Sequence, residues 1–248
     1  MADGRPVLIV AGPTACGKSA LAMAVAERFD GVVINADSMQ VYAELRILTA
    51  RPSAADEARV PHRLYGVFSA AETCSAGRWQ EMALAEIGAA HDAGRLPVVC
   101  GGTGLYLRAL TEGLAPMPDV PAAVRDALRG RLRREGAAAL HRELAARDPA
   151  MAARLHPGDG QRLARALEVL EATGRSLADW QAMPPSGAIP ALRFSTILLA
   201  PPRDELYTAC DRRLEAMIEN GALDEVRQLI AMEPVSYTHL TLPTKRIV

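Results

Sequence analysis

The sequence has 248 residues, of which half are apolar, so it can bury the core of one large domain or of a domain with an insertion. Its formal net charge of −1 excludes an overall attraction to nucleic acid or to an anionic membrane, so a polyanionic partner needs a local basic face. The four cysteines form no CxxC pair, which argues against a zinc site and a disulfide framework. No apolar run is long enough to span a membrane. We therefore expect a cytoplasmic protein.

The chain begins with an apolar strand pattern at residues 5–11, a glycine loop and a helical pattern at residues 18–29, an order typical of phosphate-binding loops. The loop GPTACGKS fits GxxxxGK[ST], in which backbone N–H groups surround an anion, Lys18 reaches its outer oxygens and Ser19 can bind Mg²⁺. Lys18 is the only lysine before Lys245. We therefore predict a phosphate site made of Gly12, Pro13, Thr14, Ala15, Cys16, Gly17, Lys18 and Ser19. The loop alone does not decide between a kinase, a hydrolase and an enzyme that expels diphosphate.

Further strands and helices alternate along the chain. We predict strands at residues 31–36, 96–100 and 194–200, and helices at residues 76–93 and 204–232. This alternation favours a parallel sheet with its working loops at the carboxyl ends of the strands. Asp37 is the acid that directly follows one of these strands. It is either a base or magnesium ligand of a small-molecule kinase, or a base that acts on a different nucleophile.

Residues 121–181 show only helical patterns, broken at residues 148–149 and 156–158. Between Arg125 and Arg175, eleven arginines face seven acids, an excess that suits either a phosphate backbone or a solvated helix face. We predict an α/β core at residues 1–119 and 190–234 and a helical insertion at residues 120–189. Residues 235–248 continue no earlier pattern, and we interpret them as an artefact or a truncated end.

Five motifs follow one another in a recognisable order: GPTACGKS at 12–19, ADSMQVY at 36–42, TARP at 49–52, GGTGLY at 101–106 and QRLARALEV at 161–169. In this combination the sequence, over about residues 5–232, resembles the tRNA dimethylallyltransferases, which prenylate N6 of adenosine 37 in tRNA. The resemblance implies a P-loop NTPase-like α/β core with a helical insertion, dimethylallyl diphosphate as donor, Mg²⁺ as cofactor and tRNA as acceptor.

The resemblance also implies a role for individual residues. Asp37 matches the general base, and Thr103 matches a hydrogen-bond donor to the bridging oxygen of the leaving diphosphate. Lys18, Arg213 and Mg²⁺ held by Ser19 face the remaining phosphate charge. The residues expected to contact tRNA are Asp37, Ser38, Met39, Gln40, Thr103, Arg125, Gln161, Arg162, Leu163, Ala164 and Arg165. The insertion would bind the anticodon stem, and the target base would leave its stack to reach Asp37.

Three other functions remain open from the residues. An adenylate prenyltransferase would share the chemistry but use AMP or ATP as acceptor. The motif QRLARALEV and the long insertion favour tRNA, because a mononucleotide needs no second domain to hold it. A small-metabolite kinase would turn over ATP, and a nucleotide-gated RNA-binding module would bind RNA without chemistry. For the tRNA-modifying enzyme we expect a monomer without membrane contact.

Overall fold

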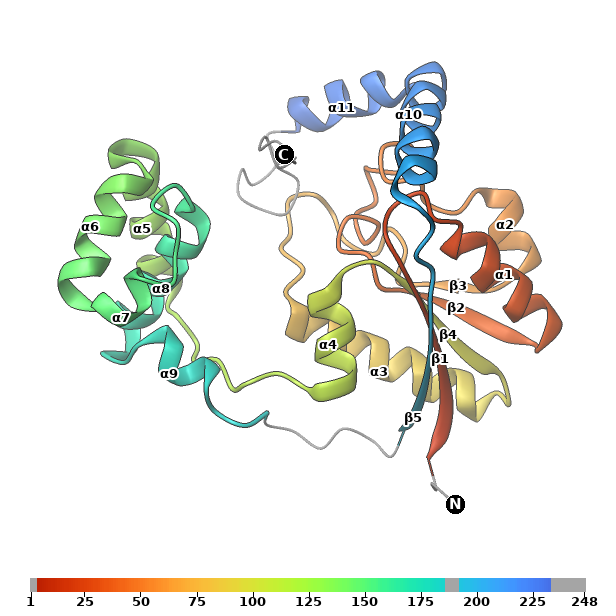
Figure 1. Cartoon of the computed structure of the whole chain (residues 1–248), viewed down its shortest axis with the longest axis horizontal. Coiled ribbons are helices and arrows are strands. Elements are labelled where there is room, and N and C mark those ends of the chain that lie inside the picture. The colour runs from red at the N-terminus through yellow and green to blue at the C-terminus, as the bar shows by residue number, and fades with distance from the viewer. Residues whose placement is uncertain (1–3, 186–191, 233–248) are drawn as a thin grey trace. The chain divides into compact units, whose positions relative to one another are not determined.

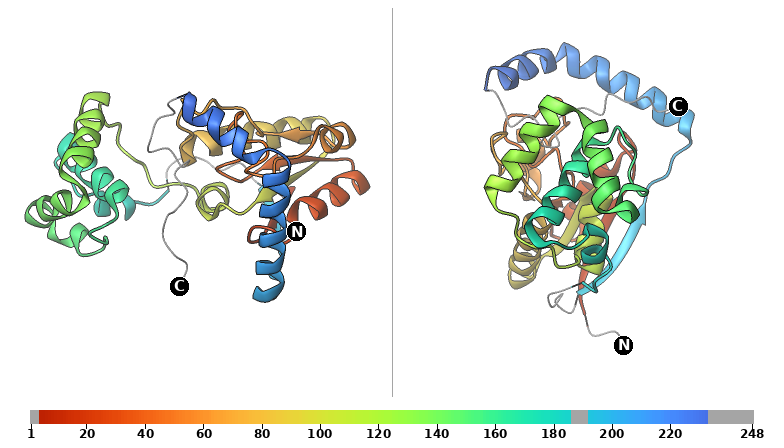
Figure 2. Two further views of the ribbon diagram at one scale, coloured as in Figure 1. Left: turned by 90° about the horizontal axis from the view of Figure 1, so that it is seen from above. Right: turned by 90° about the vertical axis from the view of Figure 1, so that its left-hand side faces the viewer.

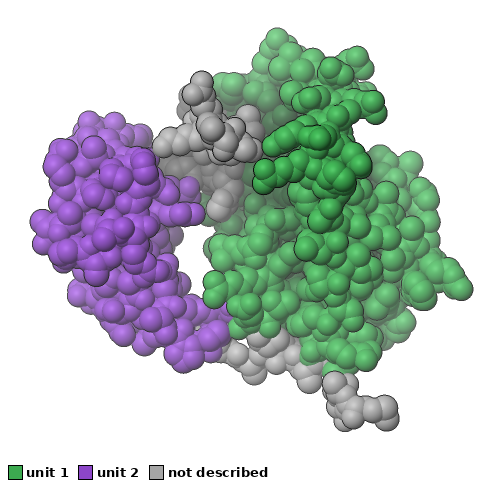
Figure 3. Space-filling view, viewed as in Figure 1, with its two compact units in different colours: residues 1–112, 188–248 green, residues 113–187 purple. Residues whose placement is uncertain are grey.

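A computed structural model of the chain describes residues 4–185 and 192–232. The predicted tail at 235–248 lies outside the described residues, as do residues 190–191 and 233–234 at the ends of the predicted core. The chain forms two compact units, coloured separately in Figure 3. We call residues 1–112 with 188–248 the α/β unit and residues 113–187 the helical unit. No helix within the described ranges is both long and apolar enough to cross a membrane.

The α/β unit contains a five-stranded parallel sheet, which confirms the predicted fold class (Figure 1). Its strand order is β3-β2-β4-β1-β5. The strands are β1 (Arg5–Ala11), β2 (Gly31–Asn35), β3 (His62–Arg63), β4 (Leu96–Gly101) and β5 (Leu192–Leu198). Ala11 is opposite Gly101, and Asn35 is opposite Cys100, so the carboxyl ends of β1, β2 and β4 meet at one edge of the sheet.

Alternate residues of the strands pack on opposite faces of the sheet. On one face, α1 (Lys18–Arg28) places Ala22 and Ala26 against Val10 and its neighbours in a buried cluster. On the other face, Ile9 packs with the buried side chains of α3 (Ala76–Asp92) and α4 (Gly104–Glu112), Trp79 among them. The short α2 (Ala54–Arg59) begins with a capping box. Both faces of the sheet are thus covered at β1, β2 and β4, whereas most side chains of the edge strand β5 are exposed.

The prediction of one helix over residues 204–232 is wrong. The segment forms α10 (Arg203–Glu219) and α11 (Ala222–Ala231), and the bend between them is visible in Figures 1 and 2. Gly221 adopts a left-handed conformation with φ 98°, which glycine reaches without the steric cost of a side chain. The hydrophobic periodicity continues through this position, so it does not reveal the break.

The helical unit consists of α5 (Ala122–Glu135), α6 (Ala137–Arg147), α7 (Pro149–Ala152), α8 (Gly160–Thr173) and α9 (Leu177–Gln181). Its core contains Leu128, Leu140, Leu144 and Leu163, each with almost no exposed surface. The two predicted breaks are confirmed. Asp148 caps α7 by accepting a hydrogen bond from the N–H of Met151, and Asp159 caps α8 in the same way. The unit thus has a core of its own.

Candidate active site

The glycine loop lies between β1 and α1. Ala15 (φ 59°) and Gly17 (φ 87°) both have left-handed backbones, and such residues turn successive N–H groups toward a common concave side. The positive end of the α1 dipole adds to the positive electrostatic potential of these N–H groups. Lys18 Nζ donates a hydrogen bond to the carbonyl of Pro13 over 2.9 Å, so the ammonium group lies across the loop. Arg213 of α10 reaches the same loop, where Nη2 donates a hydrogen bond to Thr14 Oγ1.

Asn35, the last residue of β2, fixes the backbone of Asp37. The Asn35 side chain is fully buried. Its Oδ1 accepts a hydrogen bond from the N–H of Asp37 (2.8 Å), and its Nδ2 donates to the carbonyls of Asp37 (3.0 Å) and Leu64 (3.1 Å). The indole N–H of Trp79 donates to the carbonyl of Asn35 over 2.8 Å. Sequence reasoning missed Asn35, although a polar residue inside the apolar run GVVINA was a signal.

The Asp37 and Thr103 turns are joined at the edge of the sheet. Asp37 Oδ1 accepts a hydrogen bond from the N–H of Met39 (2.9 Å). Thr103 Oγ1 accepts one from the N–H of Ser38 (2.9 Å), and the N–H of Thr103 donates to the carbonyl of Ala36 (3.2 Å). These bonds bring together two of the predicted catalytic residues, which follow different strands.

The glycine loop approaches the same two turns. The position that a Cβ atom would take on Gly102 lies 3.0 Å from the carbonyl oxygen of Gly12 and 4.0 Å from Lys18 Nζ. Burial raises the pKa of Cys100, at the end of β4, to about 11, an effect that the positive charge of Lys18 and a hydrogen bond with Ser19 partly oppose. Cys100 is therefore a neutral thiol at physiological pH. The phosphate loop and the Asp37 and Thr103 turns thus form one candidate site.

Two of the residues expected to contact tRNA also hold the local fold. Gln40 Nε2 donates hydrogen bonds to the carbonyls of Thr49 (2.8 Å) and Ala50 (3.0 Å). The Met39 side chain packs against the core cluster of the α/β unit. Ser38 is partly exposed next to them. The TARP motif is thus tied to the ADSMQVY motif.

The remaining predicted tRNA contacts lie in the helical unit. Arg125 Nη2 donates to the carbonyl of Val120 over 2.7 Å. Leu163 and Ala164 are buried in the core of the helical unit, whereas Gln161 and Arg162 of the same motif are exposed. A cavity of about 330 Å³ beside them is lined by Met151, Arg154, Leu155, Arg162, Arg165, Leu177 and Gln181. Three arginines therefore surround one hollow on the surface of this unit.

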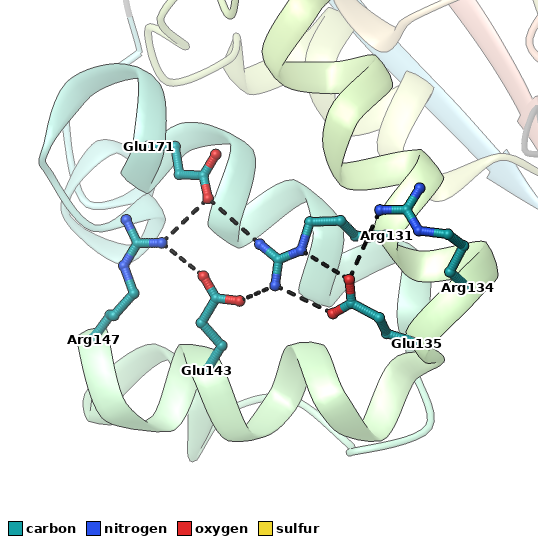
Figure 4. A network of polar contacts seen from close by, with 6 residues as sticks. All are labelled: Arg131, Arg134, Glu135, Glu143, Arg147 and Glu171. Carbon is teal, nitrogen blue, oxygen red and sulfur yellow. Dashed lines mark hydrogen bonds and ion pairs between the residues drawn. The ribbon is translucent and has the colours of Figure 1, made fainter.

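Arginines of the helical unit form ion pairs with acids: Arg162 pairs with Asp159 and Arg165 with Glu168, and further pairs with glutamates are drawn in Figure 4. Arg131 binds Glu135 and Glu143, and Arg147 bridges Glu143 (2.8 Å) and Glu171 (3.2 Å). Hydrogen bonds from Arg131 and Arg147 hold the pKa of Glu143 below its ordinary value. Part of the arginine excess between residues 125 and 175 is thus neutralised inside the unit.

Comparison with known proteins decides the family. The model of the IPP transferase family matches residues 40–244 of the chain. The chain belongs to the IPP transferase family. It is 61% identical over 228 residues to the tRNA dimethylallyltransferase of Rhodospirillum centenum, a match that covers 92% of this chain and 73% of the relative. It is 58% identical to the enzyme of the same name from Rhodospirillum rubrum, covering 91% of this chain and 69% of the relative.

Solved structures agree with this IPP transferase assignment. The tRNA isopentenylpyrophosphate transferase of Bacillus halodurans is 33% identical, with a TM-score of 0.62, over 94% of this chain and 72% of that one. A eukaryotic dimethylallyltransferase acting on tRNA is 27% identical, with a TM-score of 0.72, over 95% of this chain and 58% of that one. The predicted family and fold are therefore confirmed.

In this IPP transferase family member, the phosphate loop offers one side-chain oxygen to a magnesium ion. Within the described ranges, no three His, Cys, Asp or Glu side chains gather in a way that could hold a metal. Mg²⁺ commonly keeps several waters and takes one or two protein oxygens together with substrate phosphates. The exposed Ser19, in the first turn of α1, supplies one such oxygen. The residues thus fit a magnesium ion that arrives with a phosphate chain.

Proposed function

We propose that this protein transfers the dimethylallyl group of dimethylallyl diphosphate to N6 of adenosine 37 in the anticodon loop of tRNA, and releases diphosphate. The observation that carries the proposal is the hydrogen-bonded junction of the Asp37 and Thr103 turns beside Lys18 of the phosphate loop. The 61% identity of the chain to a relative named tRNA dimethylallyltransferase supports prenyl transfer to tRNA as the reaction at this junction. Since the acceptor is tRNA, we propose that the protein acts in the cytoplasm. We also propose that it is a monomer.

Asp37 is the proposed general base. The lone pair of an exocyclic adenine amine is delocalised into the ring, so N6 must lose a proton as it attacks the allylic carbon. Asp37 Oδ1 already accepts the N–H of Met39, so the proton goes to Oδ2. The new N–C bond forms as the allylic C–O bond breaks, and its electron pair leaves with the diphosphate.

The donors around the phosphate loop stabilise the leaving group. Negative charge grows on the bridging oxygen as diphosphate departs, and fixed donors at that place lower the barrier. The Thr103 hydroxyl now donates to Ser38 Oγ over a long 3.3 Å and can turn to the bridging oxygen. Lys18 exchanges the Pro13 carbonyl for a phosphate oxygen, and Arg213 reaches the same phosphates from α10. Ser19 would hold Mg²⁺, which would supply further positive charge against these phosphates.

The helical unit is the proposed binding site for the anticodon stem. Arg154, Arg162 and Arg165 line one cavity, and guanidinium groups bind phosphate oxygens through two parallel hydrogen bonds. A base inside a stacked loop cannot reach Asp37, so adenosine 37 must be extruded into the site. We expect tRNA affinity to fall steeply with salt concentration.

One experiment tests the donor, the acceptor and the reaction together. The protein is incubated with Mg²⁺ and labelled dimethylallyl diphosphate, and unmodified tRNA and AMP are offered in parallel. Label on tRNA alone is the expected result. Label on AMP would assign the protein to the adenylate prenyltransferases. Label on neither acceptor in a folded sample would overturn the proposal; ATP turnover would then favour a kinase, and nucleotide-dependent RNA binding would favour a binding module.

A further inference from the structure

The carboxylate of Glu225 on α11 accepts hydrogen bonds from three consecutive backbone N–H groups. Its Oε1 accepts from Arg46 (2.6 Å) and Ile47 (2.8 Å), and its Oε2 accepts from Leu48 (2.8 Å). Hydrogen bonds from N–H groups to a charged carboxylate are roughly twice as strong as neutral ones. These bonds join positions 177 to 179 residues apart in the chain.

Apolar packing holds α11 against the same region. Leu229, one turn after Glu225, packs against the core cluster of the α/β unit. Ile47 Cδ1 lies 3.9 Å from the position that a Cβ atom would take on Gly221, at the start of α11. The packing of α11 against the α/β unit thus holds the Glu225 carboxylate next to residues 46–48.

The segment held by Glu225 is also bound to the Asp37 turn. Residues 49 and 50, which follow it directly, accept the two hydrogen bonds from Gln40 Nε2. Gln40 comes three residues after Asp37, whose carboxylate accepts the N–H of Met39. On the other side, Arg51 Nη1 donates to the carbonyls of Tyr42 (3.2 Å) and Ala43 (3.0 Å). Residues 37–51 thus form one hydrogen-bonded loop, and Glu225 fixes residues 46–48 of it.

We infer that Glu225 is a positioning residue for prenyl transfer: it fixes residues 46–48 and, through Gln40, the orientation of the Asp37 carboxylate. This inference rests on the proposed function. Glu225 does not act on the substrate itself. The donor diphosphate belongs to the glycine loop at 12–19, which the Glu225 contacts do not include. Loss of Glu225 should therefore lower the rate of transfer more than the affinity for the donor.

The test compares Glu225→Ala and Glu225→Gln with Asp224→Ala. Asp224 is a matched control, because it is the neighbouring acid and its exposed carboxylate pairs with Arg227 on the same helix. Hydrogen–deuterium exchange at residues 46–48 reports the contact, and steady-state kinetics with tRNA report its effect. For Glu225→Ala we expect faster exchange at 46–48, a kcat lower by about 10- to 100-fold, and a KM for dimethylallyl diphosphate within about twofold of wild type. Asp224→Ala should leave all three unchanged.

Glu225→Gln provides a second test of the inference if the alanine variant does not fold. Its amide retains one acceptor oxygen but presents an N–H group where Glu225 has its second oxygen, so we expect a smaller loss of kcat than in the alanine variant. Faster exchange at 46–48 with an unchanged kcat would make Glu225 purely structural and overturn the inference, as would unchanged exchange. An inactive wild-type protein would instead overturn the proposed function, and the exchange measurement separates the two failures.

Discussion

The backbone N–H of Ser38 donates a hydrogen bond to Thr103 Oγ1 over 2.9 Å, joining turns that are 65 residues apart in the sequence. The Thr103 hydroxyl therefore accepts a structural hydrogen bond, while its own proton, donated to Ser38 Oγ over 3.3 Å, can turn to a substrate oxygen. This double use ties the position of the proposed leaving-group donor to the loop that carries the proposed base.

Replacing Thr103 by valine removes the hydroxyl but keeps the shape of the side chain. We expect kcat for prenyl transfer to fall about 100-fold, as when one donor is removed from an oxyanion site. Thr103→Ser keeps the hydroxyl and should retain most of the activity. Steady-state kinetics on tRNA measure both variants. A valine variant as active as wild type would exclude Thr103 from the chemistry.

Asp37→Asn isolates the proton transfer. The amide oxygen of asparagine can still accept the N–H of Met39, so the turn should persist, but its NH₂ group cannot take up a proton. We expect the rate of transfer to fall by about 10²- to 10⁴-fold, with donor binding largely retained. Single-turnover kinetics measure the rate, and calorimetric titration with dimethylallyl diphosphate measures the affinity. Unchanged turnover would rule out Asp37 as the base.

Gly101→Ala should damage the site through the backbone. A Cβ atom at this position would lie 2.2 Å from the carbonyl carbon and oxygen of Ala36, and a backbone atom cannot move aside as a flexible side chain can. We expect the free energy of unfolding to fall by about 1–3 kcal/mol, together with a loss of activity. Gly88→Ala in α3 is the matched control, since nothing lies within 4 Å of its Cβ position. There the substitution should stabilise the helix, and urea denaturation compares the two.

The ion-pair network in Figure 4 predicts a pH dependence of stability. Hydrogen bonds from Arg131 and Arg147 depress the pKa of Glu143 below 4.5, so its stabilising effect is complete above that pH and is lost as the pH falls through the depressed value. Glu143→Gln should cost about 1 kcal/mol at pH 7, and the difference from wild type should shrink between pH 4.5 and pH 3. Urea denaturation at each pH measures it. A difference that stays constant down to pH 3 would contradict the assignment.

The sequence was sufficient to predict the features that rest on local patterns. A strand, a glycine loop and a helix in succession predicted the phosphate loop, and the alternation of strands and helices predicted a parallel sheet with its working loops at the carboxyl ends of the strands. The role of Thr103 was predicted only from the resemblance to the tRNA dimethylallyltransferases. The two-residue β3 is too short to show any periodicity. The contacts of Asn35 and Glu225 depend on residues distant in the sequence, and one polar residue in a strand or helix does not indicate its partner.

The pairing of β1 with β5 also determines when the sheet can be completed during synthesis of the chain. β1 supplies the strand before the phosphate loop, yet its partner β5 follows the whole helical unit in the chain. The helical unit is one continuous segment and can fold as soon as it leaves the ribosome, whereas the sheet must wait for a pairing that closes a very long loop. The nascent protein therefore exposes an unpaired edge of β1 until residues 192–198 emerge. Strand β1 is then open to pairing with another chain, because an unpaired strand edge presents free N–H and C=O groups.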